Sequence, residues 1–580
     1  MKWVAVVCAG VWLMAGGVAF AQAPSQIPSP SQVQPPVVPP APGGARIALP
    51  QVPAGAQIPA EARRLRFKLL GFSVQDEFEE LKAQREQISE PLIGKTVTVA
   101  DVFEFADKLQ QIYVRAGFPL ARVVILPQEF EKAASIKLRV IDGYIERMDL
   151  EALAPNVRSW VAWVLSPLVH KTHLTQKALE RQLLIAGEAP GLILNATFAA
   201  GKEIGGSILV LTGRYHPVSA SLYGDNALPA VFGTGQLVGT AALNSLMGLG
   251  EQLTISAAGL PDRDFITQHP TRRYLTGSFL VPIGIDGWKL ELGATDGVTT
   301  PRVNALVASQ GQFRQARAKL SYDIVKLRDM ELTASARYEA TDEEIDTLAI
   351  TPRVPLSLDR TRVVRAAFEG IVRSRSTGTT ILFATNYSRG LSGLGARTAA
   401  DADPLLPLSR AGADAVFDKW DGRIEINQSL PENFFLAAMA SGQTSFHKAM
   451  LTSEQFDITG AKALSGFTSG ALPGDTAWSV RGELGRPFVV PAALGGVVLT
   501  PYVYASAGQR ILWQASAVET ASVYAVSYGT GLRANFAPPG PDQPDGYGFI
   551  EWSRVTGDGR NATEQSLDGY RLYTGFLLRY

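Results

Sequence analysis

The sequence predicts an all-β transmembrane barrel of about 16 antiparallel strands, preceded by two small α+β domains. Three observations predict it: an export signal at the N-terminus, two stretches in which strands and helices follow in the same order, and period-two alternation from residue 213 to the end of the 580-residue chain. After the signal, no run of about 18 apolar residues remains. Any membrane span is therefore expected to consist of strands that close on themselves.

The first 21 residues have the pattern of a signal peptide. Met1-Lys2 precedes an apolar run over 3–20, and Ala19-Phe20-Ala21 supplies the small residues that a signal peptidase reads. A membrane anchor is the alternative, but glycines dilute the run and a Pro-rich segment follows. We expect residues 1–21 to be removed and the rest of the chain to be exported.

Composition excludes several classes of function. Cys8 is the only cysteine and lies in the signal, so the exported chain has no disulfide, thiolate nucleophile or cysteine-bound metal. Lys plus Arg and Asp plus Glu are equal at 54 each, which gives no basic surface for nucleic acid. His170 and His173 form an HxxH pair without a third ligand nearby in sequence. We expect two solvated side chains there, and neither a metal site nor a cofactor.

Residues 22–63 are crowded with Pro, Ala, Gln and Ser. Such a stretch buries little apolar surface and is typical of an extended, polyproline-like tether. The prolines also argue against a long helix within 24–53, because proline removes a backbone donor and clashes with the preceding turn.

Residues 64–143 predict the first α+β domain, in the order β-α-α-β-β. Alternating apolar residues mark its strands, and two stretches at helical spacing lie between them. Thr98 is the expected N-cap of the second helix, which ends at Gly117. Residues 144–212 repeat this order in a shorter unit. A three-stranded sheet covered by two helices leaves an edge to which an extended peptide can add; a purely structural spacer is the alternative.

Residues 213–580 predict the barrel. In the stretch 330–340 apolar and polar residues alternate strictly, as lipid-facing and lumen-facing positions do in a barrel strand. Short turns such as Asp286-Gly287 and Pro431-Glu432-Asn433 alternate with long polar stretches such as 389–418, as periplasmic turns and external loops do. A soluble β-sandwich is disfavoured, because the two faces alternate over hundreds of residues and the chain ends in an aromatic residue.

Several phrases occur in an order that resembles a known family. IYVRAGFPLARVVILPQ, at 112–128, resembles POTRA domains. YGDNALPAVFGTGQ opens the barrel at 223–236, and NYSRGL and PYVYASAG follow at 386–391 and 501–508. With the signal and the tether, they resemble the two-partner secretion transporters (TpsB) of the haemolysin activation/secretion type, over residues 64–580.

The resemblance implies that the barrel lies in the lipid of the outer membrane, with both POTRA-like domains in the periplasm. It implies an unfolded exoprotein as partner, whose extended amino-terminal segment binds the POTRA domains before the chain threads through the lumen. An insertase that assembles other barrels is the alternative, and a diffusion porin has no use for residues 64–212. We expect no enzyme, because GLSGLG at 390–395 lacks the second glycine of a G-x-S-x-G elbow.

The resemblance also implies a loop that folds back into the lumen, here about 457–478. In the family its tip reads Val-Arg-Gly-Tyr or Val-Arg-Gly-Phe, and the Arg pairs with an Asp on an inward-facing strand of the form Phe-x-Asp-x-Gly. In one register the tip is Val480-Arg481-Gly482, but Glu483 then replaces the aromatic residue and almost no loop remains. In the other register the tip is Leu464-Ser465-Gly466-Phe467, and Arg481 belongs to the following strand.

We favour the second register. It places Tyr504 and Ser506 where the family has Phe and Asp, so both charges of the family's ion pair are replaced together. Removing one charge would leave a buried partner unpaired, whereas replacing both is nearly neutral. We expect Phe467 packing, backbone hydrogen bonds and a contact between Ser465 and Ser506 to hold the loop. Without a charged latch, the loop is expected to leave the lumen more readily.

Overall fold

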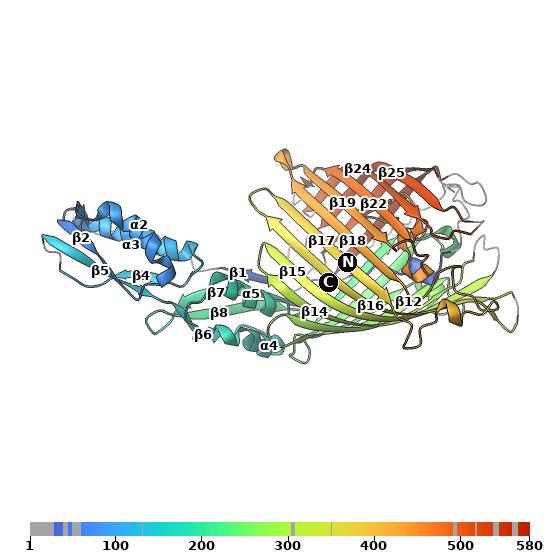
Figure 1. The fold of residues 1–580 in the computed structure, drawn as a ribbon, viewed down its shortest axis with the longest axis horizontal. Coiled ribbons are helices and arrows are strands. Elements are labelled where there is room, and N and C mark those ends of the chain that lie inside the picture. Colours follow the sequence, from blue (N-terminus) through green and yellow to red (C-terminus); the bar gives the residue numbers. More distant parts are fainter. Residues whose placement is uncertain are drawn as a thin grey trace.

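The computed structural model describes residues 28–38, 44–48, 60–129, 132–302, 308–349, 351–490, 496–516, 519–536, 545–558 and 567–580. The predicted signal peptide lies outside these residues. Figure 1 shows two small domains in a row, followed by a barrel whose strands are strongly tilted. Over the described residues, no helix is long and apolar enough to cross a membrane.

The first small domain has the predicted β-α-α-β-β order, with one short extra strand. Its elements are β2 (Arg66–Gln75), α2 (Lys82–Ser89), β3 (Thr96–Thr98), α3 (Val99–Arg115), β4 (Arg122–Ile125) and β5 (Ala133–Ile141). The sheet order is β3-β2-β5-β4. The Thr98 hydroxyl accepts from the Asp101 backbone N–H, which confirms the predicted N-cap of α3. The apolar face of α3, with Phe105, Leu109 and Tyr113, packs on the sheet.

The second small domain repeats the order with β6 (Tyr144–Asp149), α4 (Pro155–Leu165), α5 (Gln176–Ala186), β7 (Leu192–Ala200) and β8 (Gly206–Tyr215). A fourth strand, β1 (Gly44–Ile47), pairs in parallel with β7, and the sheet order is β1-β7-β8-β6. Ala45 and Ile47 of β1 pack on the domain's core. The edge of this sheet is therefore occupied by a segment about 150 residues away in sequence.

The predicted extended tether, residues 22–63, is extended in β1 and forms a helical turn in η1 (Pro30–Val33), among the parts that the structure describes. This 3-10 helix lies against the inner wall of the barrel. The Arg272 guanidinium donates to the Val33 carbonyl at 2.7 Å, and the Tyr274 hydroxyl donates to the Pro30 carbonyl at 2.5 Å. Proline at the first helical position suits this turn, because its ring fixes φ and it lacks a donor that would be unpaired there. No long helix is present in the described parts of this segment, as predicted.

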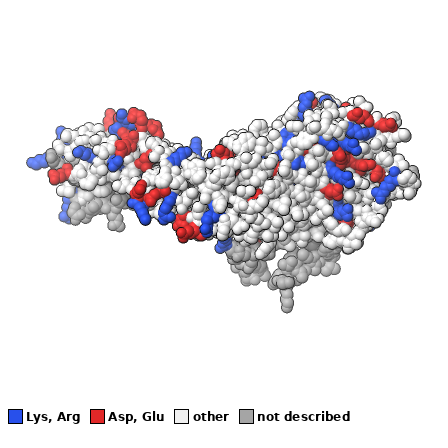
Figure 2. All heavy atoms as spheres, turned by 90° about the horizontal axis from the view of Figure 1, so that it is seen from below, with Lys and Arg blue, Asp and Glu red and all other residues white. Residues whose placement is uncertain are grey.

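The third part is a closed antiparallel barrel, which confirms the predicted architecture and strand number. Its sixteen strands are β9 (Val218–Asp225), β10 (Gln236–Asn244), β11 (Gln252–Ala258), β12 (Arg272–Ile283), β13 (Trp288–Thr299), β14 (Ser309–Lys326), β15 (Met330–Thr347), β16 (Val354–Ser374), β17 (Thr379–Gly390), β18 (Asp418–Ser429), β19 (Phe435–Thr444), β22 (Thr476–Gly485), β24 (Val497–Ile511), β25 (Ser522–Phe536), β26 (Asp545–Gly557) and β27 (Gly569–Arg579). A two-residue segment, β23 (Phe488–Val489), adds to β24, and β27 closes on β9. Figure 2 shows that the visible face of the barrel is largely uncharged between its charged ends, as a lipid-facing belt requires.

Ion pairs fix the second domain to the periplasmic rim of the barrel. Lys289 and Lys326, on β13 and β14, both pair with Glu188 after α5, at 2.8 and 2.5 Å. Arg181 on α5 donates to the carbonyls of Asp286 and Asp323 at 2.7 and 2.8 Å. This domain is therefore held to the barrel through the charged face of α5.

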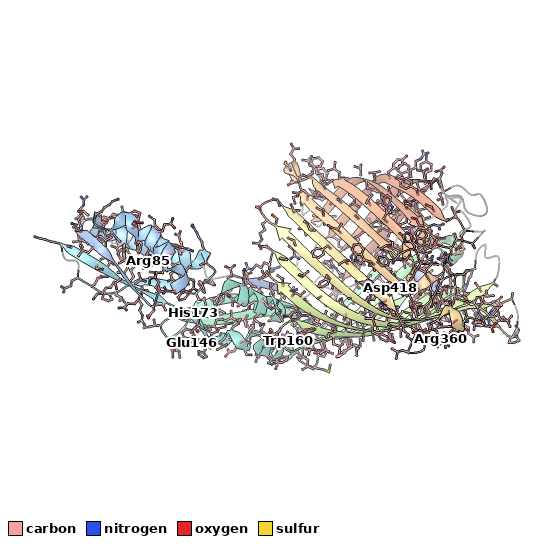
Figure 3. All side chains as sticks on the ribbon, viewed as in Figure 1. Arg85, Glu146, Trp160, His173, Arg360 and Asp418 are labelled. Carbon is pink, nitrogen blue, oxygen red and sulfur yellow. The ribbon has the colours of Figure 1, made fainter. Side chains whose placement is uncertain are left out.

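A histidine forms the joint between the two small domains. The His173 imidazole stacks on Phe78 of the first domain at 4.3 Å, and its Nδ1 lies 2.8 Å from the Asp142 carboxylate. Figure 3 places His173 between the two domains. The His173 side chain is 57% exposed, so it is solvated as expected, and it also contacts both domains. Among the described residues, no cluster of three or more His, Cys, Asp or Glu side chains is arranged to hold a metal ion.

Candidate functional site

The lumen of the barrel contains a long loop between β19 and β22. A two-strand neck, β20 (Phe456–Asp457) paired with β21 (Pro473–Gly474), separates its inner part from its roots. Above this neck the Asp457 carboxylate accepts from the backbone N–H groups of Thr459, Gly470 and Leu472, at 3.2, 2.7 and 3.3 Å. One half-buried carboxylate thus folds the loop on itself, and the apolar side chains of the loop pack on the wall.

The structure places Leu464, Ser465, Gly466 and Phe467 against the wall formed by β22 to β27. Leu464 is fully buried, and Phe467 packs in the same apolar cluster. The other members of that cluster are Ile458, Leu472, Ala477, Val523, Ala525 and Val555. Burial of a side chain as large as leucine or phenylalanine contributes about 1.5–3 kcal/mol, so packing holds a large part of the loop.

Gly466 lies where a side chain has no room. A Cβ built on it would come 2.2 Å from a methyl carbon of Val555. Its backbone N–H donates to the Ser527 hydroxyl at 3.2 Å. Glycine lets the backbone of the tip approach the wall closely enough for this hydrogen bond.

The Ser465 hydroxyl contacts an ion pair whose two partners both come from strands of the barrel wall. This hydroxyl donates to the carboxylate of Glu551 on β26, and it accepts from Nη1 of Arg481 on β22 at 2.7 Å. Nη2 of Arg481 lies 2.6 Å from the other oxygen of Glu551. The neutral tip therefore binds between a cation and an anion, and it carries neither charge itself.

The same ion pair extends into a buried network. Nε of Arg481 lies 2.7 Å from Glu483, and Glu483 also pairs with Arg533 on β25 at 2.8 Å. The Tyr502 hydroxyl donates to Glu551 at 2.7 Å. Two guanidinium groups thus face two carboxylates, which balances the charge; each of these four groups would be costly to bury alone.

A second arginine holds the backbone of the tip. Nη1 of Arg571, on β27, donates to the carbonyls of Ser465 and Phe467, and Nη2 donates to the carbonyl of Asn226 at 2.7 Å. The polar groups at the tip are therefore satisfied by side chains of the wall.

The structure assigns different roles to the two predicted wall residues. The guanidinium of Arg481 lies 3.7 Å above the ring of Tyr504, so this tyrosine supports the network through a cation–π contact. The Tyr504 hydroxyl bonds with Ser527 and Ser553, at 3.0 and 2.5 Å. Ser506 donates to the Ser527 carbonyl at 2.9 Å. The expected contact between Ser465 and Ser506 is therefore wrong, because each hydroxyl has a different partner.

Sequence reasoning missed Arg481 and Glu551 as parts of this site. Arg481 lies in β22, as the favoured register predicts, but it is not an ordinary strand residue. Strict alternation in β22 turns Arg481 and Glu483 inward. Glu551 alternates inward in the same way on β26. The sequence signal that could have indicated this ion pair was the presence of inward-facing charges of opposite sign on two nearby strands.

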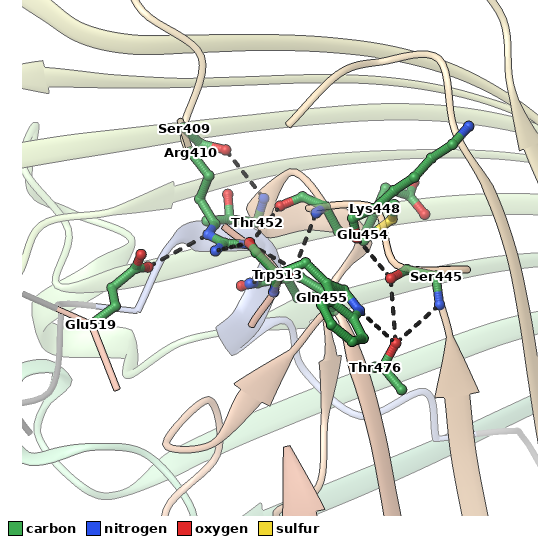
Figure 4. Close-up of polar contacts among 12 residues, drawn as sticks. Ser409, Arg410, Ser445, Lys448, Thr452, Glu454, Gln455, Thr476, Trp513 and Glu519 are labelled. Atoms are coloured by element: carbon green, nitrogen blue, oxygen red, sulfur yellow. Dashed lines mark hydrogen bonds and ion pairs between the residues drawn. The ribbon is translucent and has the colours of Figure 1, made fainter. Parts of the chain in front are cut away.

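The roots of the loop are clamped at the external end of the barrel (Figure 4). The fully buried Asp475 carboxylate accepts from Arg410 at 2.6 Å, from the backbone N–H groups of Met450 and Trp513 at 3.1 and 2.8 Å, and from the Gln455 amide at 3.1 Å. Arg410 comes from the long loop between β17 and β18. One carboxylate therefore joins three external segments.

Glu454 clamps the other root. Its carboxylate lies 2.9 Å from Arg365 on β16 and 2.9 Å from Lys419 on β18. Burial alone would raise the pKa of Glu454, but these two cations overcome that effect and lower it to about 2. Glu454 therefore stays ionised, and paired, at any physiological pH.

On the opposite side of the lumen the wall lines a polar space. This cavity of about 440 Å³ lies over β14 to β19. Its lining includes Lys319, Arg337, Glu369, Asp421 and Arg423. The loop tip packs on β22 to β27, so this polar cavity lies on the side of the lumen that the tip does not occupy.

Comparisons with known proteins agree with this architecture. The model of the haemolysin secretion/activation protein family ShlB/FhaC/HecB matches residues 205–534, and the model of the ShlB-type POTRA domain matches residues 67–143. The heme/hemopexin transporter protein HuxB of Haemophilus influenzae (strain 86-028NP) is 19% identical over 397 residues, which is 67% of each chain. The outer membrane transporter CdiB of Escherichia coli is 20% identical over 407 residues, 69% of this chain and 66% of its own.

Solved structures have the same fold. CdiB from Escherichia coli superposes with a TM-score of 0.65 at 17% identity, over 92% of both chains. CdiB from Acinetobacter baumannii gives 0.56 at 14% identity, over 100% of this chain and 97% of its own. The family model covers more than half of the sequence. This chain therefore belongs to the haemolysin secretion/activation protein family ShlB/FhaC/HecB, and it is an outer-membrane transporter of a secreted protein.

Proposed function

We propose that the first POTRA domain captures the extended amino-terminal segment of an unfolded exoprotein by strand addition. The observation that carries this proposal is β1: an extended segment of this chain already adds to the edge of the second POTRA sheet. That edge, on β7, is therefore taken. In the first domain β3 pairs only with Arg66–Lys68 of β2, although β2 continues to Gln75. The rest of that edge is the place where we expect the cargo strand to add.

The cargo then passes through the lumen on the β14 to β19 side, where the polar cavity lies. The tip of the inserted loop, Leu464 to Phe467, is the part that moves aside. Its withdrawal breaks hydrogen bonds and apolar contacts but leaves the buried pair of Arg481 and Glu551 together on the wall. The ion pair of Lys462, beside the tip, with Glu425 of β18 would also be lost, but Lys462 is largely exposed and such a pair contributes little. The name of HuxB refers to heme/hemopexin and the name of CdiB specifies no cargo, so the cargo of this chain is proposed only as a secreted protein.

A photocrosslinker at Leu70 tests the capture step. This side chain is 58% exposed on β2, just beyond the part that β3 covers. We expect it to crosslink to the secreted protein that this chain transports, while the same group at the exposed Lys82 of α2 does not. Equal crosslinking at both positions would contradict capture at the β2 edge.

Deletion of the chain separates transport from the alternative, assembly of other barrels. Transport predicts loss of one secreted partner with a normal outer membrane. Broad loss of outer-membrane proteins would favour assembly.

A further inference from the structure

The periplasmic turn between β10 and β11 presents three apolar side chains to the outside. In this turn, residues 245–251, Leu246, Met247 and Leu249 are all exposed, Met247 to 62%. Contiguous exposed apolar side chains of this size are uncommon on a water-facing surface and mark an interaction site.

The turn is rigid, so these side chains are held outward by the structure. The buried Glu251 carboxylate accepts from the backbone N–H groups of Met247 and Leu249, at 2.7 and 3.0 Å. The Ser245 N–H donates to the Glu251 carbonyl at 2.7 Å. A buried acid that organises the backbone in this way leaves the apolar side chains no route into the protein interior.

The apolar surface of the turn is continuous with the lipid-facing belt of the barrel. Leu243 of β10 and Leu253 of β11 are partners in register, and both face outward. They lie directly next to the turn, so the same apolar surface continues from the two strands into Leu246, Met247 and Leu249. The occupant that already covers the belt, the bilayer, is adjacent to the turn.

Helix α4 of the second POTRA domain extends this surface. The ring of the buried Trp160 packs directly on Gly250, where an added Cβ would come within 2.9 Å of it. Asn156 donates to the Leu246 carbonyl at 3.4 Å. Trp163, 51% exposed, packs edge-on against Trp160 with ring centroids 5.8 Å apart. Figure 3 places Trp160 where this domain meets the barrel.

We propose that Leu246, Met247, Leu249 and Trp163 insert into the periplasmic leaflet of the outer membrane and anchor helix α4 to its phospholipids. Tryptophan suits this depth, because its ring is apolar and its N–H stays hydrated at the headgroup level. The domain is then fixed twice: α5 binds the barrel through charges, and α4 binds the membrane through apolar side chains. Both attachments keep the POTRA array at a constant angle to the pore.

Site-directed fluorescence tests the anchor. The chain without its signal peptide has no cysteine, since Cys8 is the only one. Met247→Cys and Trp163→Cys are each labelled with bimane in the full-length transporter, which is then reconstituted in phosphatidylcholine vesicles. Quenching is read with brominated acyl chains and with aqueous iodide. Ile204→Cys is the matched control, because Ile204 is 82% exposed on the β7–β8 turn, which lies next to the first domain.

We expect bromolipid to quench the labels at 247 and 163 at least threefold more than the label at 204, and iodide to show the reverse order. Labels at 247 and 163 that respond to both quenchers as the label at 204 does would overturn the proposal. Should Trp163→Cys fail to give the folded, heat-modifiable barrel, Ser159→Cys replaces it, because the exposed Ser159 lies one turn before Trp163 on the same face of α4, and it is read by the same criterion.

Discussion

The tip and the roots of the inserted loop are held in opposite ways. At the roots the loop itself carries the charge: Asp475 and Glu454 are buried carboxylates that pair with cations from other segments. At the tip the wall carries both charges, and the loop contributes only Ser465 between Arg481 and Glu551.

This difference decides which end can leave. Withdrawing a root would separate a buried carboxylate from its cation, and breaking such a pair costs about 3–5 kcal/mol. Withdrawing the tip leaves Arg481 and Glu551 paired, so neither charge loses its partner. It costs the apolar packing and the hydrogen bonds of the tip to charged side chains of the wall, about 1.5–3 kcal/mol each. We therefore expect the tip to be the end that is released and the roots to act as the hinge.

The largest effect is expected at Asp475. Asp475→Ala removes the acceptor of four donors and leaves Arg410 without its closest partner. We expect a loss of stability of about 3–5 kcal/mol, because the buried Arg410 is left with the more distant Glu519, at 3.5 Å, and three other donors lose their acceptor. Thermal unfolding, followed by heat-modifiable migration on gels, measures it. The control combines Arg410→Met with Asp475→Asn, and it should recover part of the lost stability. No recovery would show that the loss does not come from the unpaired Arg410.

A similar but smaller loss is expected for Arg481→Met. Glu551 then keeps only neutral partners, whereas Glu483 still pairs with Arg533. We expect about 2–3 kcal/mol of destabilisation, and a tip that leaves more often, because an unpaired carboxylate prefers lumen water. Single-channel recording should show more frequent opening. Arg481→Met with Glu551→Gln should restore stability without restoring the closed state, since Ser465 still lacks its cation.

A double substitution that moves the cation from the wall to the tip tests the difference between tip and roots further. Ser465→Arg with Arg481→Ser places the cation on the loop and leaves Glu551 on the wall. Release now separates an ion pair, so opening should become rarer than in the natural chain. Opening as frequent as before would show that the position of the charge does not control release.

A modest effect is expected for Ser465→Ala. It removes one neutral group from the ion pair and leaves that pair intact, so stability should fall by about 1 kcal/mol and opening should rise several-fold. Thermal unfolding and single-channel recording together separate this outcome from that of Arg481→Met, which changes both quantities more strongly.

The smallest effect is expected for Ser506→Ala, which removes only a hydrogen bond within the wall. Stability should change by about 0.5–1 kcal/mol, and opening should not change. A marked increase in the frequency of opening would indicate that Ser506 does contact the tip.

Much of the fold could be predicted because its signals are local. Period-two alternation marks the barrel strands, and Thr98 marks the start of α3. The position of the tip was predicted from the resemblance of this stretch to the loop pattern of the family. The network around Arg481 could not be predicted, because Glu551 lies 70 residues away and only the curvature of the barrel brings the two together.

The ordered structure of the Pro-rich segment could not be predicted for the same reason, because its partners lie far away in sequence. Its composition describes a chain that cannot build a core of its own, and η1 builds none. It is ordered because the barrel supplies the partners: Arg272 and Tyr274 bind its carbonyls, and Val33 packs with Leu228 and Phe232. Composition predicts how a segment behaves on its own. Here the wall of the barrel, which contacts the segment, determines its structure.

Thiol accessibility tests most directly whether the tip leaves while the roots stay. Ser465→Cys and Ser445→Cys are matched substitutions: both serines are buried, at 1% and 0% exposure, and the first lies at the tip and the second beside the roots. In outer-membrane vesicles a small maleimide should label the Ser465→Cys variant at least tenfold faster than the Ser445→Cys variant. Equal rates, or faster labelling of the Ser445→Cys variant, would contradict the account.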